Sequence, residues 1–393
     1  MKYDFDKETF RRGTNCVKWD ETTIDDVIPL WVADMDFEVL PEITEAMRKR
    51  IDHCVFGYAM VGESYYESII NWFHRRHHWT IRREWILYTT GVVPAMSAAI
   101  KALTMPGERV LVLSPIYNCF FSCIRNNGCE ILESPLVTQS SSHTPHPSYL
   151  VDWEDFEAKC ADEKTTVFLL CNPHNPAGRV WTKEELEKMN DICLRHGVKV
   201  ISDEIHCELV MPGYHYTPFA SISEACAANS IICGSPSKSF NIAGLQMAHI
   251  ICQNTEWRRR VNRAININEI CDVNPFAPLA DEAAYNHGDQ WIDEVNDYIF
   301  GNYQALCDFF AKELPALKVY KMEGTYLAWV DITATGYTSD ALCHKLLKEG
   351  HVWLNSGTTY GNKTGEGFIR INLATQRARL MEALRRIHKV LAS

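Results

Sequence analysis

Short apolar runs recur through the middle of the chain, and each is long enough to form one buried strand. Five such runs, rich in branched residues, lie at 109–114, 166–171, 198–203, 230–235 and 248–253. Residues typical of turns flank each run. Continuous apolar runs, rather than alternation with polar residues, are typical of strands buried on both faces of a parallel sheet.

The segments between these runs have the periodicity of helices. Thr182, with Glu185 three residues later, forms a capping box, and Leu186, Met189 and Cys193 then follow on one helix face. Strands that alternate with helices in this way predict an α/β fold with a mainly parallel sheet.

The last third of the chain has a less regular pattern, which favours a smaller α+β domain. We expect two long helices in 276–313, strands near 317–320 and at 326–331 and 367–374, and a helix at 339–349. A final amphipathic helix carries its apolar stripe at Leu380, Leu384, Ile387 and Leu391. The domains we predict are an N-terminal segment joining the small domain (1–45), a large domain (46–285) and a small C-terminal domain (286–393).

Composition narrows the class of protein. The chain has 393 residues, of which 46% are hydrophobic and 23% are charged, and its formal net charge is −11. These values favour a large core and exclude disordered and collagen-like chains. We expect no nucleic-acid partner, because such a partner requires a basic face. The sequence has no apolar run of membrane-spanning length and no signal-peptide pattern, so we expect a cytoplasmic protein with no membrane partner.

Fifteen cysteines are scattered along the chain, and none forms a C-x-x-C pair. Cys119 and Cys123 are one helical turn apart and Cys129 follows, but no further His or Cys ligand lies at close spacing. A buried cysteine in a reducing compartment behaves as a small hydrophobic residue. We therefore expect neither a metal site nor disulfides.

Two segments follow the pattern of ligand-binding turns. TTGVVPAM (89–96) leads into a helix expected to start near Pro94, and free N–H groups at a helix N-terminus suit a phosphate. CNPHNPAGRVW (171–181) places Asn175 on a rigid turn at the carboxyl end of a strand, where ligands bind in open α/β sheets. The alternatives are a turn that only reverses the chain and a structural Asx turn.

Two further segments place charged residues at strand ends. In ISDEIHCEL (201–209), Asp203 and Glu204 close an apolar strand, where a carboxylate is costly unless a positive group pairs with it. In GSPSKSFNIAGLQ (234–246), Lys238 lies among serines just past another strand. The alternatives are a helix N-cap and a solvated surface lysine.

The order of these four segments resembles that of the fold-type I enzymes that use pyridoxal phosphate (PLP) and are related to aspartate aminotransferase. The resemblance spans nearly the whole chain and is strongest to the MalY/PatB-type C–S lyases, also called cystathionine β-lyases. The segments that carry it are WVADMDF (31–37), FGY (56–58), NPHNPAGRVW (172–181), SDEIH (202–206), SKSFNIAGLQ (237–246) and GFIRINLA (367–374). It implies a mainly parallel seven-stranded sheet between helices, plus a smaller α+β domain.

The resemblance implies roles for the residues around the cofactor ring. Lys238 would bind the cofactor's aldehyde covalently and, once freed, take the Cα proton of the substrate. Asp203 would keep the ring nitrogen protonated, Asn175 would donate to the ring phenolate oxygen, and Tyr117 would stack on the ring. His206, where aminotransferases place a tyrosine, would share the phenolate contact or would be a packed imidazole.

The cofactor phosphate would be bound by backbone and hydroxyl groups. The resemblance assigns this role to the N–H groups of Val92 and Val93 and to the hydroxyls of Ser235 and Ser237. Tyr58 would reach the phosphate of the partner subunit's cofactor, which implies a homodimer with shared active sites.

Arg370 would clamp the substrate carboxylate with a bidentate fork. Strand alternation places Arg370 on the face opposite Ile369 and Ile371, which would pack on the domain core. Ala33 lies in the loop that the resemblance expects to close over the carboxylate, and Trp31 of that loop would pack.

The sequence departs from the family pattern at several positions. Gln246 stands where aminotransferases carry a phosphate-binding arginine, as in the C–S lyase type. Asn118 replaces a second tyrosine after Tyr117, near the substrate in relatives, which puts the substrate range or the rate in question. GTTYGN (357–362) and ATQR (374–377) also differ from the usual forms and should affect loop shape more than reaction type.

The function implied is β-elimination from L-cystathionine or another S-conjugate of L-cysteine, giving a thiol, pyruvate and ammonia. The nearest alternative is an aminotransferase of an L-amino acid on the same scaffold. A PLP-binding regulatory protein is a third interpretation, which the filled catalytic positions disfavour.

Overall fold

A mixed sheet of seven strands forms the centre of the larger part of the molecule. The computed structural model describes residues 1–141, 144–268 and 272–392. The strand order is β2-β10-β9-β8-β7-β3-β4, and only β10 runs antiparallel to its neighbours. The strands are β2 (Ile86–Thr89), β3 (Arg109–Ser114), β4 (Glu130–Pro135), β7 (Thr165–Cys171), β8 (Lys199–Asp203), β9 (Ser230–Gly234) and β10 (Ala248–Ile251). The predicted seven-stranded, mainly parallel sheet is confirmed.

The two edge strands, β2 and β4, are the ones that were not among the five predicted runs. The five runs identified in the sequence became the five inner strands, β3, β7, β8, β9 and β10. Edge strands β2 and β4 are partly exposed, and in β4 the exposed Glu130 and Glu133 flank Ile131 and Leu132. A strand with one exposed side does not need the continuous apolar sequence that marks an inner strand.

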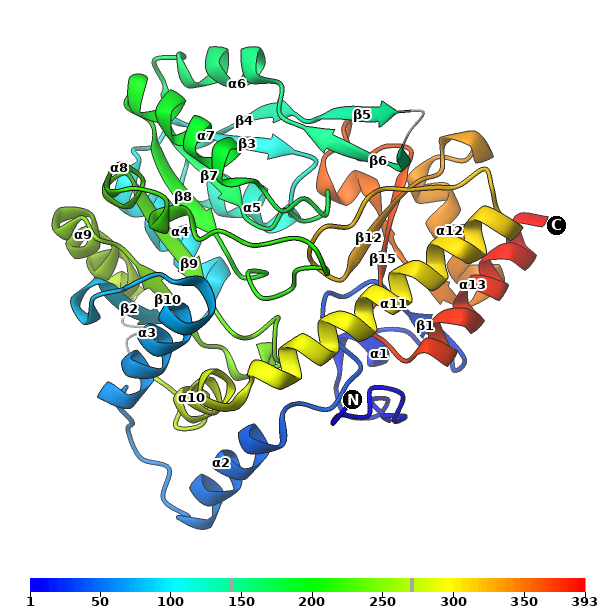
Figure 1. Cartoon of the computed structure of the whole chain (residues 1–393), viewed down its shortest axis with the longest axis horizontal. Coiled ribbons are helices and arrows are strands. Elements are labelled where there is room, and N and C mark those ends of the chain that lie inside the picture. Colours follow the sequence, from blue (N-terminus) through cyan, green and yellow to red (C-terminus); the bar gives the residue numbers. More distant parts are fainter. Residues whose placement is uncertain (142–143, 269–271, 393) are drawn as a thin grey trace.

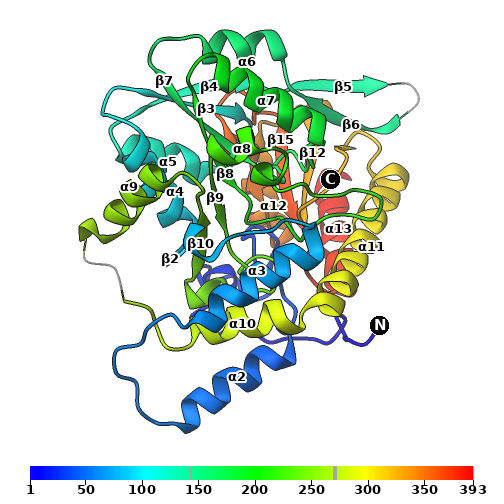
Figure 2. The ribbon, with the colours of Figure 1, turned by 60° about the vertical axis from the view of Figure 1, so that its left-hand side comes forward.

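Helices cover both faces of this sheet (Figures 1 and 2). Alternate residues of each strand enter separate clusters, as Val110 and Leu111 of β3 illustrate. One cluster packs against α4 (Val92–Leu103), α5 (Asn118–Asn126) and α9 (Thr255–Ile265). The other packs against α6 (Trp153–Cys160), α7 (Lys183–Arg195) and α8 (Glu224–Ala228).

Two helix starts test the expectations from sequence. The capping box at Thr182 and Glu185 is present, and it starts α7. Helix α4 begins at Val92, two residues earlier than the expected start near Pro94. Proline fits anywhere in the first turn, because the N–H it lacks has no helical partner there.

The C-terminal part carries a smaller antiparallel sheet, in the order β11-β12-β15-β14. Its strands are β11 (Lys318–Val319), β12 (Leu327–Asp331), β14 (Asn355–Ser356) and β15 (Phe368–Asn372). The helices are α10 (Ala277–His287), α11 (Asp289–Glu313), α12 (Ser339–Gly350) and α13 (Arg377–Ala392). All of these elements except β14 were expected, and Ile369 and Ile371 are fully buried. The domain boundaries near 45 and 285 stay predictions. Near 285 no linker marks a boundary, because only Gly288 separates α10 from α11.

The N-terminal segment lies along the smaller sheet before it enters the large part. Strand β1 (Ile28–Pro29) pairs in parallel with β13 (Val352–Trp353), and α1 (Val17–Asp20) precedes it. Helix α2 (Pro41–Asp52) lies at the outer edge beside α10, and α3 (Glu63–His77) follows. A hairpin of β5 (Val137–Ser141) and β6 (Thr144–Leu150) completes the list of strands. Among the described helices, none has the length and apolar character needed to cross a membrane.

Candidate active site

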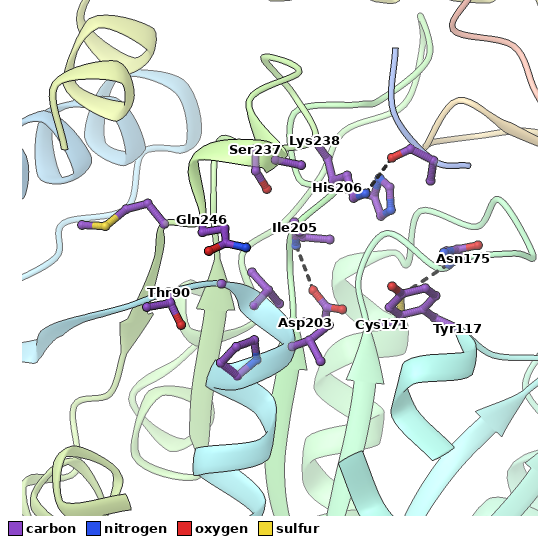
Figure 3. A pocket seen from close by; sticks show the side chains of 17 residues that line it. Thr90, Tyr117, Cys171, Asn175, Asp203, Ile205, His206, Ser237, Lys238 and Gln246 are labelled. Carbon is purple, nitrogen blue, oxygen red and sulfur yellow. Dashed lines mark hydrogen bonds between the residues drawn. The ribbon is translucent and has the colours of Figure 1, made fainter. Parts of the chain in front are cut away.

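A cavity of about 400 Å³ lies at the carboxyl ends of the central strands. Residues from all four segments singled out in the sequence line this cavity, although Thr90 and Gln246 are 156 residues apart along the chain. Figure 3 shows their side chains grouped around it. The predicted site residues that line it are Ala33, Val92, Val93, Tyr117, Asn175, Asp203, His206, Ser237 and Lys238.

Lys238 lies in the turn after β9, and its amine is held at one side of the cavity (Figure 3). Its Nζ donates to the carbonyl oxygen of Ala33 at 2.6 Å. Burial lowers the pKa of Lys238, while Asp34 and Asp203 act in the opposite direction. A lysine with a lowered pKa has more of the neutral amine, which is the form that attacks an aldehyde or accepts a proton.

Asp203 is the last residue of β8 and is buried beneath the cavity. One of its carboxylate oxygens accepts the Ile205 N–H at 3.1 Å. Burial raises the pKa of Asp203 to about 7, and the neighbouring Glu204 carboxylate adds to this effect. A buried carboxylate of this kind is stabilised by a cation placed beside it, such as a protonated ring nitrogen.

Asn175 and Arg370 are in contact at the side of the cavity. Arg370 Nη1 donates to Asn175 Oδ1 at 3.2 Å, and Nη2 donates to the Trp31 carbonyl at 2.7 Å. The guanidinium also lies over the ring of Tyr360, 4.7 Å from its centroid. Arg370 Nε is buried and has no partner among the described residues. Arg370 is therefore fixed beside the cavity, although it does not itself line it.

The start of α4 forms one end of the cavity. Val92 and Val93 line it, and among the described residues the first N–H of the helix with a backbone acceptor is that of Ala95, which donates to the Gly91 carbonyl. Free N–H groups at a helix start favour an anion. Thr90 and Gln246 lie at the same end (Figure 3). Thr90 was missed by the sequence reasoning, although its hydroxyl immediately precedes the glycine loop.

Tyr117 and His206 also line the cavity, where each would lie beside the pyridine ring of a bound cofactor. Tyr117 precedes α5, and burial raises its pKa. Burial lowers the pKa of His206 to about 3, with Lys238 and Arg370 acting in the same direction, so the imidazole is neutral at physiological pH. His206 Nδ1 has no partner in the described structure. Both interpretations of His206, cofactor contact and packed ring, remain open.

Three predicted site residues lie away from the cavity. Ser235 is buried behind the wall, where its hydroxyl donates to the Met247 carbonyl at 2.7 Å and accepts the Ser237 N–H at 3.1 Å. Asn118 starts α5 and faces a separate hollow between α5 and the loop 358–364. Tyr58 is 97% exposed in the single chain. Their roles stay predictions.

The loop 31–34 borders the cavity through Ala33, and contacts of its flanking residues anchor it. Trp31 stacks on Trp353 with ring centroids 4.4 Å apart, so its expected packing role is confirmed. Asn372 Nδ2 donates to the Val32 and Asp34 carbonyls at 2.6 and 2.7 Å. These contacts join segments that are far apart in sequence, so local sequence patterns could not predict them.

The cavity has the groups that a phosphorylated pyridine aldehyde requires. An amine with a lowered pKa, a buried carboxylate and a helix start face it from three sides, and among the described residues the carboxylate has no salt-bridge partner and the first N–H groups of the helix have no backbone acceptor. Tyr117 supplies an aromatic face. The residues present therefore fit PLP. In the described part of the chain, no three His, Cys, Asp or Glu side chains cluster as they would around a metal ion.

Comparisons with known proteins agree with this fit. A family model described as aminotransferase class I and II matches residues 25–387. The chain is 42% identical to cystathionine beta-lyase PatB of Bacillus subtilis (strain 168), over 99% of this chain and 100% of that protein. Cystalysin from Treponema denticola, solved with pyridoxal 5'-phosphate, is 35% identical over 100% and 99% of the two chains, with a TM-score of 0.93. The PLP-bound C-S lyase from Staphylococcus hominis is 31% identical over 100% and 99%, with a TM-score of 0.91.

Proposed function

Because the chain belongs to the aminotransferase class I and II family, we propose that it is a PLP-dependent carbon–sulfur β-lyase. It cleaves L-cystathionine or a related S-conjugate of L-cysteine, with water, into a thiol, pyruvate and ammonia. The observation that carries this proposal is the grouping of Lys238, Asp203 and Asn175 around one cavity, in a chain 42% identical to a cystathionine beta-lyase.

Different side chains of the protein would bind the cofactor and accept the proton from the substrate Cα. When bound, PLP supplies an electron-withdrawing ring that stabilises the charge left on the substrate Cα. Asp203 would hold a proton at the ring nitrogen, Asn175 would contact the phenolate oxygen, and Tyr117 would cover the ring face. The amine of Lys238, whose pKa is lowered by burial, would take the Cα proton. The α4 start and Ser237 would hold the phosphate.

The test is turnover of L-cystathionine without any added 2-keto acid. Purified protein should release pyruvate and free thiol in equal amounts, because β-elimination needs no amino acceptor. The Lys238→Ala variant is the control for pyruvate formed without the enzyme. A strict requirement for a 2-keto acid would identify an aminotransferase instead and would overturn the proposal.

Arg370 should set substrate binding rather than cofactor binding. Losing a charge-assisted pair with a carboxylate costs about 1.5–3 kcal/mol, or roughly tenfold to a hundredfold in affinity. We expect Arg370→Ala to lower kcat/KM for L-cystathionine by at least that factor and to retain PLP. Arg370→Lys should recover only part of the activity, since a point charge cannot form the fork.

The matched control for Arg370 is Arg385→Ala, an exposed arginine on α13 that pairs only with Glu382 among the described residues. It should behave as the wild type. Equal kcat/KM for wild type and Arg370→Ala would remove Arg370 from the substrate site.

We also propose a cytoplasmic homodimer with composite sites. The segment around Tyr58 exposes several apolar side chains beside α2, namely Ile51, Val55, Phe56 and Met60. A group of exposed apolar residues is typical of an interaction surface. The cytoplasmic location is supported by the cysteines, all of which are free thiols in the described part of the chain.

Mixing two inactive variants tests the shared site. If Tyr58→Phe is impaired, equal amounts of Tyr58→Phe and Lys238→Ala subunits should recover about a quarter of the wild-type activity, because half of the dimers would have one intact site. Subunits must first be exchanged by mild denaturant, with unmixed samples treated identically. A monomer by sedimentation, or no recovery, would contradict the composite site.

A further inference from the structure

The carbonyl oxygen of Ala33 accepts two hydrogen bonds at the edge of the cavity. One comes from Lys238 Nζ at 2.6 Å, and the other comes from the hydroxyl of Tyr326 at 2.9 Å. Tyr326 is fully buried and immediately precedes β12. A carbonyl oxygen has two lone pairs, so these two donors use its full capacity. The position of the lysine amine is thus tied to a tyrosine that is 88 residues away in sequence.

The smaller sheet fixes the backbone on both sides of Ala33. Asn372 holds the carbonyls of Val32 and Asp34, and in the sheet it pairs with Leu327, the residue after Tyr326. Three consecutive carbonyls are therefore held by two side chains from adjacent positions of paired strands. Within this arrangement, Tyr326 is the side chain that fixes the carbonyl facing Lys238.

We propose that Tyr326 is a positioning residue for Lys238, which acts by fixing the Ala33 carbonyl that receives the lysine amine. The inference rests on the proposed function, in which Lys238 binds the cofactor aldehyde and takes the Cα proton. An amine that donates one N–H to a fixed oxygen has its lone pair directed away from that oxygen. Proton transfer depends strongly on such placement of the reacting groups.

The hydroxyl of Tyr326 shares the Ala33 oxygen with the amine, and the electron density that it draws from this oxygen makes the oxygen a weaker acceptor for the amine. Without this hydroxyl, the Ala33 oxygen is a better acceptor for a lysine ammonium, so the pKa of Lys238 should rise in Tyr326→Phe. The other ionisable groups that act on Lys238 are left in place by this change; they are Asp34, Asp203, Arg370, Cys119 and His206. A change in the titration of Lys238 would therefore report on the Ala33 oxygen.

The experiment measures how fast PLP attaches to cofactor-free protein as the pH is varied. Because the neutral amine is the nucleophile, the midpoint of this profile reports the pKa of Lys238. We expect the midpoint of Tyr326→Phe to lie at higher pH than that of the wild type. The phenylalanine keeps the ring beside His206, whose centroid is 5.9 Å away, so packing is preserved.

Tyr303→Phe is the matched control. The buried Tyr303 hydroxyl donates to the Tyr320 backbone carbonyl at 3.1 Å, so this variant loses the same kind of hydrogen bond outside the cavity. Its attachment profile should coincide with that of the wild type. Similar small losses of melting temperature in the two variants would show that any difference in the profile is not a general effect on stability.

Turnover gives a second measurement. Tyr326→Phe should lower kcat for L-cystathionine by about two- to tenfold, the range for one neutral hydrogen bond, with KM unchanged. An unchanged attachment profile would overturn the role of Tyr326, even if the wild type attaches PLP at Lys238. Failure of the wild type to attach PLP would instead overturn the proposed function, so the two failures are distinguishable.

Discussion

Replacing Lys238 by alanine should abolish covalent attachment of PLP and lower the rate of β-elimination by about 10⁴-fold, the upper range for loss of a positioned general base. The reason is that one amine serves both as the group that binds the aldehyde and as the acceptor of the Cα proton. No other lysine lines the cavity among the described residues, so no nearby amine could replace it.

The measurement is the mass of the protein after borohydride reduction, together with the initial rate of pyruvate release. Wild-type protein should gain one reduced cofactor on the peptide that contains Lys238, and Lys238→Ala should gain none. Lys101→Ala, which removes an exposed lysine from α4, is the matched control and should keep both properties. Substantial turnover by Lys238→Ala would mean that another group is the base.

Lys238, Asp203 and Asn175 could be identified from sequence because each one ends, or closely follows, a buried apolar run. Parallel strands bring their carboxyl ends to one edge of a sheet, so residues at those ends meet whatever their separation along the chain. The α4 start was predicted differently, as a glycine-containing turn before a helix, because the preceding strand β2 was not among the predicted runs. The strand ends indicated where ligand groups could lie, and the resemblance to the PLP enzymes implied that these segments form one site.

Contacts made by the smaller sheet could not be predicted in this way. Tyr326 reaches Ala33 across 293 residues, and Arg370 reaches Trp31 across 339. Such contacts depend on how the N-terminal segment lies along β12 and β15, and no local pattern encodes that placement. Asn118 shows that closeness in sequence does not guarantee a place in the same cavity. It directly follows Tyr117, yet at the start of α5 it lines a different hollow.

Asp203 has opposite effects on the protein with and without cofactor. In the cofactor-free protein, burial raises the pKa of Asp203 to about 7, far above the ordinary value of about 3.9 for aspartate in an unfolded chain. Between about pH 4 and pH 7 the folded protein therefore holds a proton that the unfolded chain would release. The stability contributed by this group is complete below about pH 4 and is lost as the pH rises through about 7.

Asp203→Asn should remove this pH dependence while keeping the local structure, since the amide oxygen can still accept the Ile205 N–H. We expect the melting temperature of the cofactor-free variant to rise relative to that of the wild type as the pH increases from about 4 to 7. Thermal melts at several pH values check this. A constant difference across that range would contradict the placement of an ionisable, unpaired carboxyl group in the cavity.

With the cofactor bound, the same substitution should be damaging. Asparagine cannot balance a protonated ring nitrogen, and breaking a buried ion pair costs about 3–5 kcal/mol, or roughly a hundredfold to several thousandfold in rate. Asp203→Asn should therefore lose PLP on dialysis and slow the release of the Cα proton, measured as exchange of that proton with deuterium from solvent. A variant that is more stable than wild type without cofactor, yet weaker in cofactor retention and proton exchange, would show that Asp203 is kept at an energetic cost for its interaction with the ring. A variant that retains cofactor and exchanges the proton at the wild-type rate would exclude that interaction, whatever its stability.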